Sequence, residues 1–336
     1  MTARAKVVAG LVIGLVTAGC VAGERVDVAG LTLPDGFTST LVIDDLNGPT
    51  QVATGADGTV FVAQLNGDEG GSTGQVVAIG RDGQSREVLY GGLDKPTGVA
   101  VVGDQLYVME RNRLSVGTID GERLDVIVDD LPSNGRSEGS LSVAPDSALF
   151  YTTSGALREG DVVVESGVVW RLLPGEAPTE YATGFKNAYS HTFHESDVFV
   201  AEISDGTFDG TPAADEIVAI NQGDDGGWPA CVGNHRPVVE YGGDEASCQT
   251  KAETVALFDP GATPTSIVVA PWDQDLLVAA LWNQGHVVAV SHIDERPATA
   301  ETIVEGIEHP QDLHVVNDAI WLTDFDDGRI VEIKPT

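Results

Sequence analysis

Carboxylate side chains and glycines gather in one part of the chain, between residues 202 and 216. Glu202 ends an apolar run, a loop containing Ser204 follows it, and Asp215 and Glu216 come after that loop. Calcium takes about six to eight oxygen ligands, and backbone carbonyls contribute to such sites together with carboxylates. Asp and Gly are also ordinary residues of solvated turns. The segment therefore predicts either a calcium site formed by Glu202, the Ser204 loop, Asp215 and Glu216, or a solvated turn.

A weak repeat shows which elements must position these residues. Each copy has a turn, often ending in Pro, then an apolar strand, a Gly/Asp/Asn turn and a second apolar strand. Corresponding positions lie mostly 42 to 50 residues apart and are Val52, Val99, Leu141, His191, Ile267 and Leu313. This period, with about four strands per copy and no amphipathic helix, is typical of a β-propeller. We predict an all-β, six-bladed β-propeller that occupies residues 31–336 as a single domain.

The two ends of the repeat are expected to meet. The last copy is short, and the segment Phe37–Ile43, which precedes the first full copy, could supply its missing outer strand. Such a strand closes the ring and removes exposed strand edges. The one long gap between copies contains an insertion at about 229–260 with Cys231 and Cys248. In an oxidising compartment we expect these two cysteines to form a disulfide, which is worth about 3 kcal/mol in chain-entropy models.

In antiparallel strands, the start of the first strand and the end of the second lie on the same side of the disc. The repeat thus places the turns before the first strands and the ends of the second strands around one mouth of the central channel. Turns entering the first strands carry Lys95, Arg136, Lys186, Asn187 and His309, and second strands end in Gln64, Glu110, Glu202 and Asp324. A positive mouth on a negative protein attracts an anionic ligand. The alternative is that these cations pair with the acids and only join the blades; both roles can hold.

The segment from Gly184 to Cys231 resembles the signature of a known family. It reads Gly184-Phe-Lys186-Asn187, then Glu202, Asp215-Glu216-Ile217 and Gly227-Trp228-Pro229-Ala-Cys231. This is similar to the signature of the glucose/sorbosone dehydrogenases, soluble propellers that oxidise sugars with pyrroloquinoline quinone (PQQ) and calcium. The resemblance implies PQQ bound by Lys95, Lys186, Asn187 and His309. It also implies calcium at the backbone of the Ser204 loop and at the carboxylates near Asp215 and Glu216.

One departure from the family pattern concerns the catalytic base. Arg136 stands where the family has the His that takes the proton of the sugar hydroxyl. A guanidinium stays protonated and cannot act as a base. His191 and His194 are possible substitutes, but we expect His191 to face a neighbouring blade and His194 to lie on the surface.

The resemblance and the departure leave several function classes open. The chain is either a PQQ- and calcium-dependent sugar dehydrogenase or a catalytically inactive binding module for a sugar or an anionic ligand. A calcium-dependent lactonase-type propeller, with Glu202, Asn187 and Asp324 as metal ligands, is a weaker third class.

The N-terminus reads as an export signal. Arg4 and Lys6 precede the apolar run from Val7 to Val16, which is too short for a stable membrane span. The following Thr17-Ala-Gly-Cys20 resembles the bacterial lipobox, in which the Cys is lipidated; an ordinary cleavage site is the alternative. We predict a signal peptide at 1–20, a short tether at 21–30, and a protein held outside the cytoplasmic membrane by lipid on Cys20, or secreted.

The net charge of −34 limits the partners of the chain. Nucleic acid and anionic membrane surfaces are excluded as partners, because both repel an acidic protein. The acids are spread along the chain, as on a soluble surface. We therefore expect a monomer that binds a small molecule and, if it is an enzyme, passes electrons to an acceptor in the cell envelope. Contact with the membrane is expected only through the lipid anchor.

Overall fold

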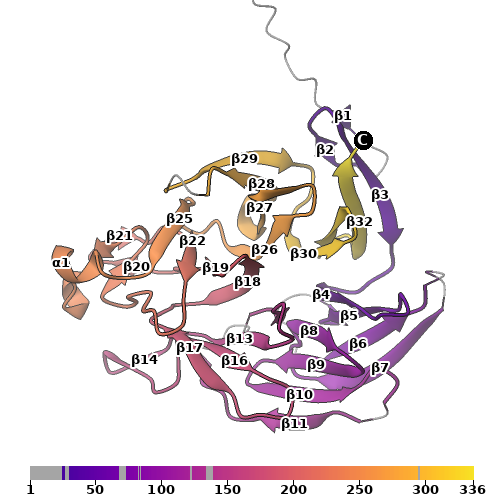
Figure 1. The fold of residues 1–336 in the computed structure, drawn as a ribbon, viewed down its shortest axis with the longest axis horizontal. Helices are drawn as coiled ribbons and strands as arrows, with labels where there is room; N and C mark the ends of the chain where they lie inside the picture. The colour runs from indigo at the N-terminus through magenta and orange to yellow at the C-terminus, as the bar shows by residue number, and fades with distance from the viewer. Residues whose placement is uncertain are drawn as a thin grey trace, which may run out of the picture.

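The computed structural model describes residues 25–26, 30–67, 73–81, 83, 85–121, 123–133, 139–293 and 296–336. Within these ranges the chain forms six four-stranded antiparallel sheets that follow one another in sequence. The sheets surround a central axis like the blades of a propeller (Figure 1). The prediction of an all-β, six-bladed propeller is confirmed.

In each blade the first strand lies nearest the axis, and first strands of adjacent blades contact one another. Blade 1 consists of β4 (Pro49–Thr54), β5 (Val60–Gln64), β6 (Gly74–Ile79) and β7 (Arg86–Leu93). Blade 2 consists of β8 (Gly98–Val102), β9 (Gln105–Glu110), β10 (Arg113–Thr118) and β11 (Asp125–Val128). Blade 3 consists of β12 (Ser142–Val143), β13 (Leu149–Thr153), β16 (Val168–Leu172) and β17 (Thr179–Thr183).

The second half of the chain continues the ring. Blade 4 consists of β18 (Ala188–His194), β19 (Asp197–Glu202), β22 (Glu216–Ile220) and β25 (Glu253–Leu257). Blade 5 consists of β26 (Pro264–Ala270), β27 (Asp273–Leu281), β28 (His286–Ser291) and β29 (Thr299–Val304). Blade 6 consists of β30 (Pro310–Val316), β31 (Ala319–Asp324), β32 (Arg329–Pro335) and, from the N-terminal side, β3 (Phe37–Ile43).

The strand β3 closes the ring as predicted. It pairs with β32 over its whole length, from Phe37 opposite Pro335 to Ile43 opposite Ile330. The preceding β2 (Thr32–Leu33) places Leu31 and Leu33 in the core between blades 5 and 6. A short strand, β1 (Arg25–Val26), pairs with β2, inside the segment expected to be a tether. Residues 1–24, with the expected signal peptide and Cys20, lie outside the described residues.

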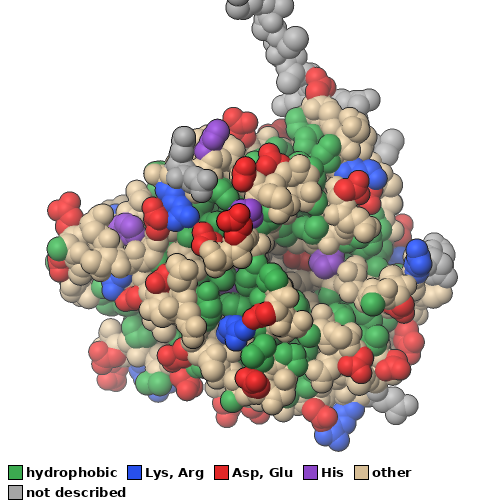
Figure 2. Space-filling model, in the orientation of Figure 1, with side chains coloured by type: hydrophobic (Ala, Val, Ile, Leu, Met, Phe, Trp, Pro, Cys, Tyr) green, Lys and Arg blue, Asp and Glu red, His purple; other side chains and the backbone are tan. Residues whose placement is uncertain are grey.

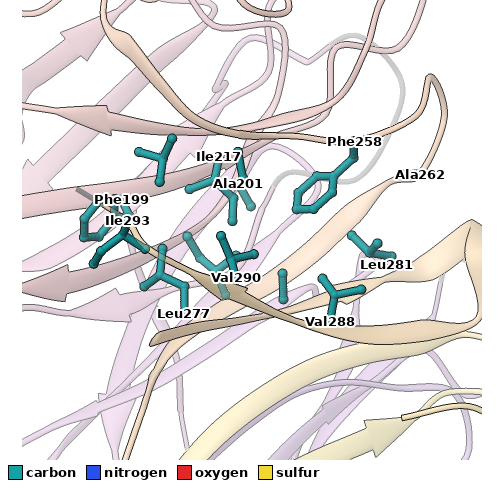
Figure 3. Packing of buried hydrophobic residues seen from close by; sticks show 14 residues of the cluster. Phe199, Ala201, Ile217, Phe258, Ala262, Leu277, Leu281, Val288, Val290 and Ile293 are labelled. Carbon is teal, nitrogen blue, oxygen red and sulfur yellow. The ribbon is translucent and has the colours of Figure 1, made fainter. Parts of the chain in front are cut away.

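The blades are held against each other by apolar side chains between their faces. Figure 3 shows the cluster between blades 4 and 5, where Phe199, Ala201 and Ile217 meet Leu277, Leu281, Val288 and Val290. Similar clusters occur between the other blades, so each sheet is covered on both sides. Strands buried on both faces are expected to be continuously apolar. The runs Val60–Ala63 and Val198–Ala201 have this composition.

Hydroxyl groups link the first strands around the mouth of the channel. The residue after the turn donates a hydrogen bond to a backbone carbonyl of the next blade, and this repeats from blade to blade. The bonds are Thr50 to Pro96 (2.9 Å), Thr97 to Gly139 (3.3 Å), Ser140 to Tyr189 (3.1 Å) and Thr265 to Pro310 (3.0 Å). These bonds give the repeated Pro-Thr dipeptide of the sequence a structural role.

A second belt of hydrogen bonds depends on β-bulges. In four blades the register of the first two strands shifts near the start of the first strand, and the side chain after this shift lines the channel. These side chains are Gln51, Ser190, Ser266 and Asp312. Three of them accept hydrogen bonds from backbone N–H groups of adjacent first strands: Asp312 from Val52 (3.0 Å), Ser190 from Ile267 (3.2 Å) and Ser266 from Leu313 (3.0 Å).

Gln51 serves two blades at once. Its amide oxygen accepts hydrogen bonds from the backbone N–H groups of Val99 (2.9 Å) and Leu141 (3.0 Å), and its Nε2 donates to Leu141 O (2.8 Å). No bulge is seen between β8 and β9, or between β12 and β13, in the residues that the structure describes. The longer side chain of Gln51 thus serves the first strands of blades 2 and 3 from blade 1.

An insertion interrupts blade 4 between β22 and β25. It contains β23 (Cys231–Val232), β24 (Arg236–Pro237), η1 (Val239–Tyr241) and α1 (Glu245–Cys248). A disulfide joins Cys231 to Cys248, as predicted. Shorter hairpins extend blades 3 and 4: β14 (Leu157–Arg158) with β15 (Asp161–Val162), and β20 (Thr207–Phe208) with β21 (Thr211–Pro212). None of the helices in the described part of the chain has the length and apolarity of a membrane span.

Deleting residues 30–43 tests the closure of the ring. The deletion exposes the edge of β32 and removes the buried side chains of Leu31, Leu33 and Ile43. Each such side chain contributes about 1.5–3 kcal/mol when buried. We expect the free energy of unfolding, measured by urea denaturation, to fall by several kcal/mol. Leu41→Thr is the control, because Leu41 lies on the same strand and is 48% exposed; a deletion no more harmful than this substitution would refute closure by β3.

Asp312→Asn tests the belt through pH. Burial raises the pKa of Asp312 to about 7 from its ordinary value of 3.8. As pH rises, the unfolded chain therefore ionises at Asp312 before the folded protein does, and folding loses stability from this group between about pH 4 and 7. We expect the wild type to lose a few kcal/mol relative to the variant across this window, at about 1.4 kcal/mol per pKa unit. Parallel stability curves for the two proteins would show that Asp312 does not hold this proton.

Candidate functional site

The mouth of the channel is bordered by the ends of the second strands. Their polar side chains accept hydrogen bonds from the backbone of the turn that enters the first strand of the same blade. Gln64 Oε1 accepts from Asn47 N (3.2 Å), Glu110 Oε2 from Asp94 N (2.7 Å), and Glu202 Oε1 from Lys186 N (2.6 Å). These groups thus fix the turns that carry the predicted cations.

Two acids at the mouth form ion pairs within their own blades. Glu110 lies 3.6 Å from Arg113, and Asp324 lies 3.0 Å from Arg329. Both partners are arginines of third strands, β10 and β32; neither is one of the cations expected at the mouth, and neither pair joins two blades. Burial is the main cause that raises the pKa of both carboxyls.

Lys95, Lys186 and Asn187 lie at the mouth, at the positions the repeat assigned to them. Lys95 is half-buried and adopts a positive φ of 52° in the turn before β8. Lys186 is also half-buried; its Nζ lies 3.4 Å from Gly155 O and 5.9 Å from the ring centroid of Trp228. Asn187 is 6% exposed, and its Oδ1 accepts no hydrogen bond in the structure. A ligand donor at the mouth could satisfy this oxygen.

His309 lies at the mouth in contact with Trp282 and Asp326, two residues that the sequence did not indicate. Its ring stacks on Trp282 of η2 (Trp282–Gln284), with centroids 4.3 Å apart and planes inclined by 18°. Its Nδ1 lies 2.6 Å from Asp326 Oδ2. Because a carboxylate accepts the hydrogen bond, Nδ1 carries a hydrogen, and in the neutral ring Nε2 then carries the lone pair. The imidazole is 30% exposed and so remains accessible.

Glu202 and Glu216 lie opposite one another on β19 and β22 and border a buried cavity of about 10 Å³. Ser204 and Trp228 also line this cavity, and Trp228 Nε1 has no hydrogen-bond partner. Burial raises the pKa of Glu202 to about 8, and the nearby Glu216 adds to the increase. Burial likewise raises the pKa of Glu216. The space suits one water molecule or one ion.

Asp215 occupies a different environment. Its Oδ1 accepts a hydrogen bond from Ser204 N (2.8 Å) and its Oδ2 from Thr263 N (2.7 Å), so it joins blade 4 to the turn entering blade 5. Burial raises its pKa to about 6. Across the described ranges, no group of three or more His, Cys, Asp or Glu side chains is arranged to hold a metal ion. A calcium ion here would need backbone oxygens besides Glu202 and Glu216.

Arg136, the residue at the family position of the base, lies within 134–138, outside the described residues. His191 faces the neighbouring blade, as expected, and its Nε2 lies 2.8 Å from Thr152 Oγ1 of blade 3. His194 is half-buried at the end of β18, away from the mouth. Among the histidines in the described ranges, His309 is thus the one placed at the mouth with a carboxylate partner.

Comparisons with solved structures identify the same fold in sugar dehydrogenases. A putative oxidoreductase (glucose dehydrogenase) of Thermus thermophilus is 20% identical, with a TM-score of 0.71 over 89% of this chain and 100% of that one. The PQQ-bound aldose sugar dehydrogenase of Streptomyces coelicolor is 19% identical, with a TM-score of 0.68 over 90% and 99%. A gluconolactonase of Xanthomonas campestris is 18% identical, with a TM-score of 0.57 over 93% and 92%.

No protein-family model matches the chain, and no curated protein matches it in sequence. At these identities the structural matches show the fold and leave the activity open. The resemblance read from residues 184–231 is confirmed at this level: the chain has the β-propeller fold of the soluble PQQ-dependent sugar dehydrogenases.

Calcium binding between Glu202 and Glu216 can be tested at pH 8. Bound calcium should raise the free energy of unfolding by about 2.7 kcal/mol at a hundredfold excess over Kd. Glu202→Gln and Glu216→Gln should abolish this increase in a urea titration with and without calcium. Glu110→Gln is the matched control, since Glu110 also accepts a turn N–H. Equal calcium effects in wild type and both variants, or none in the wild type, would reduce the cavity to a water site.

Proposed function

We propose that the chain is a quinoprotein that binds PQQ at the channel mouth and oxidises a hydroxyl group of a sugar. The observation that supports this most directly is the group formed by Trp282, His309 and Asp326 on the same face as Lys95 and Lys186. The first three residues offer an aromatic platform and a proton acceptor. The lysines offer positive charge.

The residues at the mouth fit the chemical groups of PQQ. PQQ is a planar, aromatic tricarboxylic acid, so it needs cations, a flat apolar contact and hydrogen-bonding partners. Lys95 and Lys186 match the carboxylates in charge, although an ammonium lacks the fork of a guanidinium. The stack of Trp282 on His309 matches the flat ring. Asn187 Oδ1, buried without a partner, matches a ring N–H.

Bound at the mouth, PQQ would supply a two-electron acceptor for the hydride of the sugar. The residues of this chain would orient the sugar and take up the proton of its hydroxyl. His309 is suited to the second task, because Asp326 fixes its tautomer with the lone pair on Nε2. Arg136 cannot take the proton, since a guanidinium stays charged. Its charge would instead add to the attraction for an anion.

Export and anchoring belong to the same proposal. The lipobox-like Cys20 places the propeller outside the cytoplasmic membrane, where disulfides persist. The Cys231–Cys248 bond agrees with that location. Electrons would pass from the reduced cofactor to an acceptor of the cell envelope. Calcium at Glu202 and Glu216 would stabilise the turn that carries Lys186.

A binding module without turnover is the second candidate, and Arg136 favours it. It would use the same mouth, cations and aromatic stack, but release its ligand unchanged. The lactonase-type arrangement has less support. Asp324 accepts a hydrogen bond from Asp327 N and pairs with Arg329, so it presents no unengaged carboxylate to a metal in the channel.

The deciding experiment combines cofactor binding with turnover. Purified protein is titrated with PQQ and calcium by calorimetry, and dye reduction is followed over a panel of aldoses. We expect PQQ binding, and activity that falls about 10²–10⁴-fold in His309→Gln, the usual value of a general base. His194→Gln is the control. Binding in both variants with turnover lost only in His309→Gln separates the base from the binding site.

Other outcomes select other functions. Tight PQQ binding without turnover in any protein identifies the binding module; in that case Arg136→His, which restores a base at the family position, should create sugar oxidation. Absence of PQQ binding removes the dehydrogenase and the PQQ-binding module together. Wild-type activity that survives both His309→Gln and Arg136→Ala would assign the base to another residue.

A further inference from the structure

The segment 155–166, here named the apolar hairpin, extends blade 3 from the mouth end of β13 and displays apolar side chains to solvent. Its strands β14 and β15 place Leu157 directly opposite Val162, and Val164 follows near the base. These three side chains are 36%, 44% and 83% exposed. Neighbouring apolar side chains that remain exposed on a soluble protein commonly mark an interaction site.

The backbone of the apolar hairpin is already ordered without a partner. Its tip, Glu159-Gly160, has positive φ angles of 56° and 93°, as a two-residue type I′ turn requires. Ser166 closes its base, because the hydroxyl donates to Val163 O (2.7 Å) and accepts from Ala156 N (3.2 Å). An ordered surface loses less conformational entropy when a partner binds.

The base of the apolar hairpin is joined to the turn that carries Lys186. Gly155 N donates a hydrogen bond to Lys186 O (2.7 Å), and Lys186 Nζ lies 3.4 Å from Gly155 O. Trp228 packs so closely that a Cβ on Gly155 would lie 2.7 Å from a carbon of its ring. Leu157 follows two residues later, about 7 Å along an extended chain. A molecule bound to the hairpin therefore lies beside the mouth.

The charge around the apolar hairpin favours a positively charged partner. Glu159, Asp161 and Glu165 are exposed beside the apolar side chains, and Arg158 is the one cation of the segment. In Figure 2, hydrophobic and acidic side chains lie side by side at the edge of the ring where Figure 1 places β14. Complementary charge assists docking, and like charge opposes it. A second copy of this chain, with a net charge of −34, is therefore disfavoured.

The position of the apolar hairpin in the ring disfavours a lipid surface as its partner. The chain enters the propeller through β1 and β2 at blades 5 and 6, whereas the hairpin belongs to blade 3, across the ring (Figure 1). Cys20, the expected site of lipid attachment, precedes β1 by five residues in the sequence. Five residues span at most about 18 Å. An anchored propeller thus presents the hairpin to the aqueous side.

We propose that the apolar hairpin docks a soluble, positively charged protein that contacts it through an apolar patch ringed by basic side chains. The role of this partner rests on the proposed function: it is a one-electron carrier that reoxidises the reduced quinone at the adjacent mouth. Each carrier molecule takes one electron, so two of them reoxidise one reduced quinone, whose two protons pass to water. The docking itself requires no quinone.

The probe is a basic c-type cytochrome, a one-electron carrier whose haem edge is ringed by lysines. The same cytochrome with succinylated lysines is its counterpart, because succinylation reverses the charge and leaves the haem in place. Calorimetry on the full chain without PQQ, at low ionic strength, should show saturable binding of the basic form. We expect succinylation to weaken this binding by about tenfold or more.

Val162→Thr combined with Val164→Thr tests the apolar contact. Threonine keeps the β-branched shape but adds a hydroxyl that loses its hydrogen bonds to water when a partner covers it. This double variant should bind the basic cytochrome about tenfold more weakly than the wild type. Val88→Thr with Val126→Thr is the matched control, since these valines are 53% and 47% exposed on the outer strands β7 and β11. It should bind as the wild type does.

Absence of saturable binding, equal binding of the two cytochrome forms, or equal affinities of the hairpin and control variants would overturn the proposal. Hairpin-dependent binding to phosphatidylcholine vesicles in place of the cytochrome would assign the surface to lipid and overturn it as well. None of these measurements requires PQQ, so they stand apart from the test of the proposed function.

Turnover with PQQ and calcium tests the role of the partner. The hairpin variant should reduce a subsaturating amount of the cytochrome about tenfold more slowly than the wild type, in line with its weaker binding. A small dye, which needs no docking surface, should be reduced at the wild-type rate. Equal rates with the cytochrome would refute the carrier role. No dye reduction by the wild type would refute the proposed function and leave the binding result intact.

Discussion

The inner edge of each blade imposes the constraint on which this ring depends. A first strand has a neighbour on one side only, so its other backbone N–H groups face the channel without a strand partner. Asp312, Ser190, Ser266 and Gln51 accept hydrogen bonds from these groups. They thereby link four adjacent pairs of first strands, and Gln51 also links blade 1 to blade 3. The blades are thus joined by polar bonds at the axis and by apolar packing farther out.

The hydrogen bonds of Gln51, Ser190, Ser266 and Asp312 form a belt between two halves of the channel, and the walls of these halves differ in polarity. On the mouth side of the belt, Glu110 and Glu202 hold the turns that carry the half-buried Lys95 and Lys186. In the half of the channel that lies away from the mouth, most lining side chains are aliphatic. Burial lowers the pKa of His191 and of His314, so both imidazoles are neutral there. Charged side chains are therefore gathered at the mouth, whereas the opposite half of the channel is mostly apolar.

The sequence was sufficient for the fold because its signals are local and repeated. Alternating turns and apolar runs predicted the blades, and a single leftover strand, Phe37–Ile43, predicted the closure. The site was less accessible to such reasoning. Trp282 and Asp326 meet His309 from two other turns, and a repeat places turns on one face without specifying which side chains touch. The spacing of the residues also does not report that both oxygens of Asp215 accept backbone hydrogen bonds, because that depends on how the turns of blades 4 and 5 pack.

Burial also decides which histidine could act as a base. His191 lies four residues after Asn187 in the segment that resembles the sugar dehydrogenases. Burial lowers its pKa to about 3. A group that binds a proton so weakly is a poor base near neutral pH. His309 is partly exposed and has an acceptor on Nδ1, which would stabilise the imidazolium as the proton arrives. A propeller that had lost its base at position 136 would therefore find a replacement only on the solvated mouth, where a charged imidazole is tolerated.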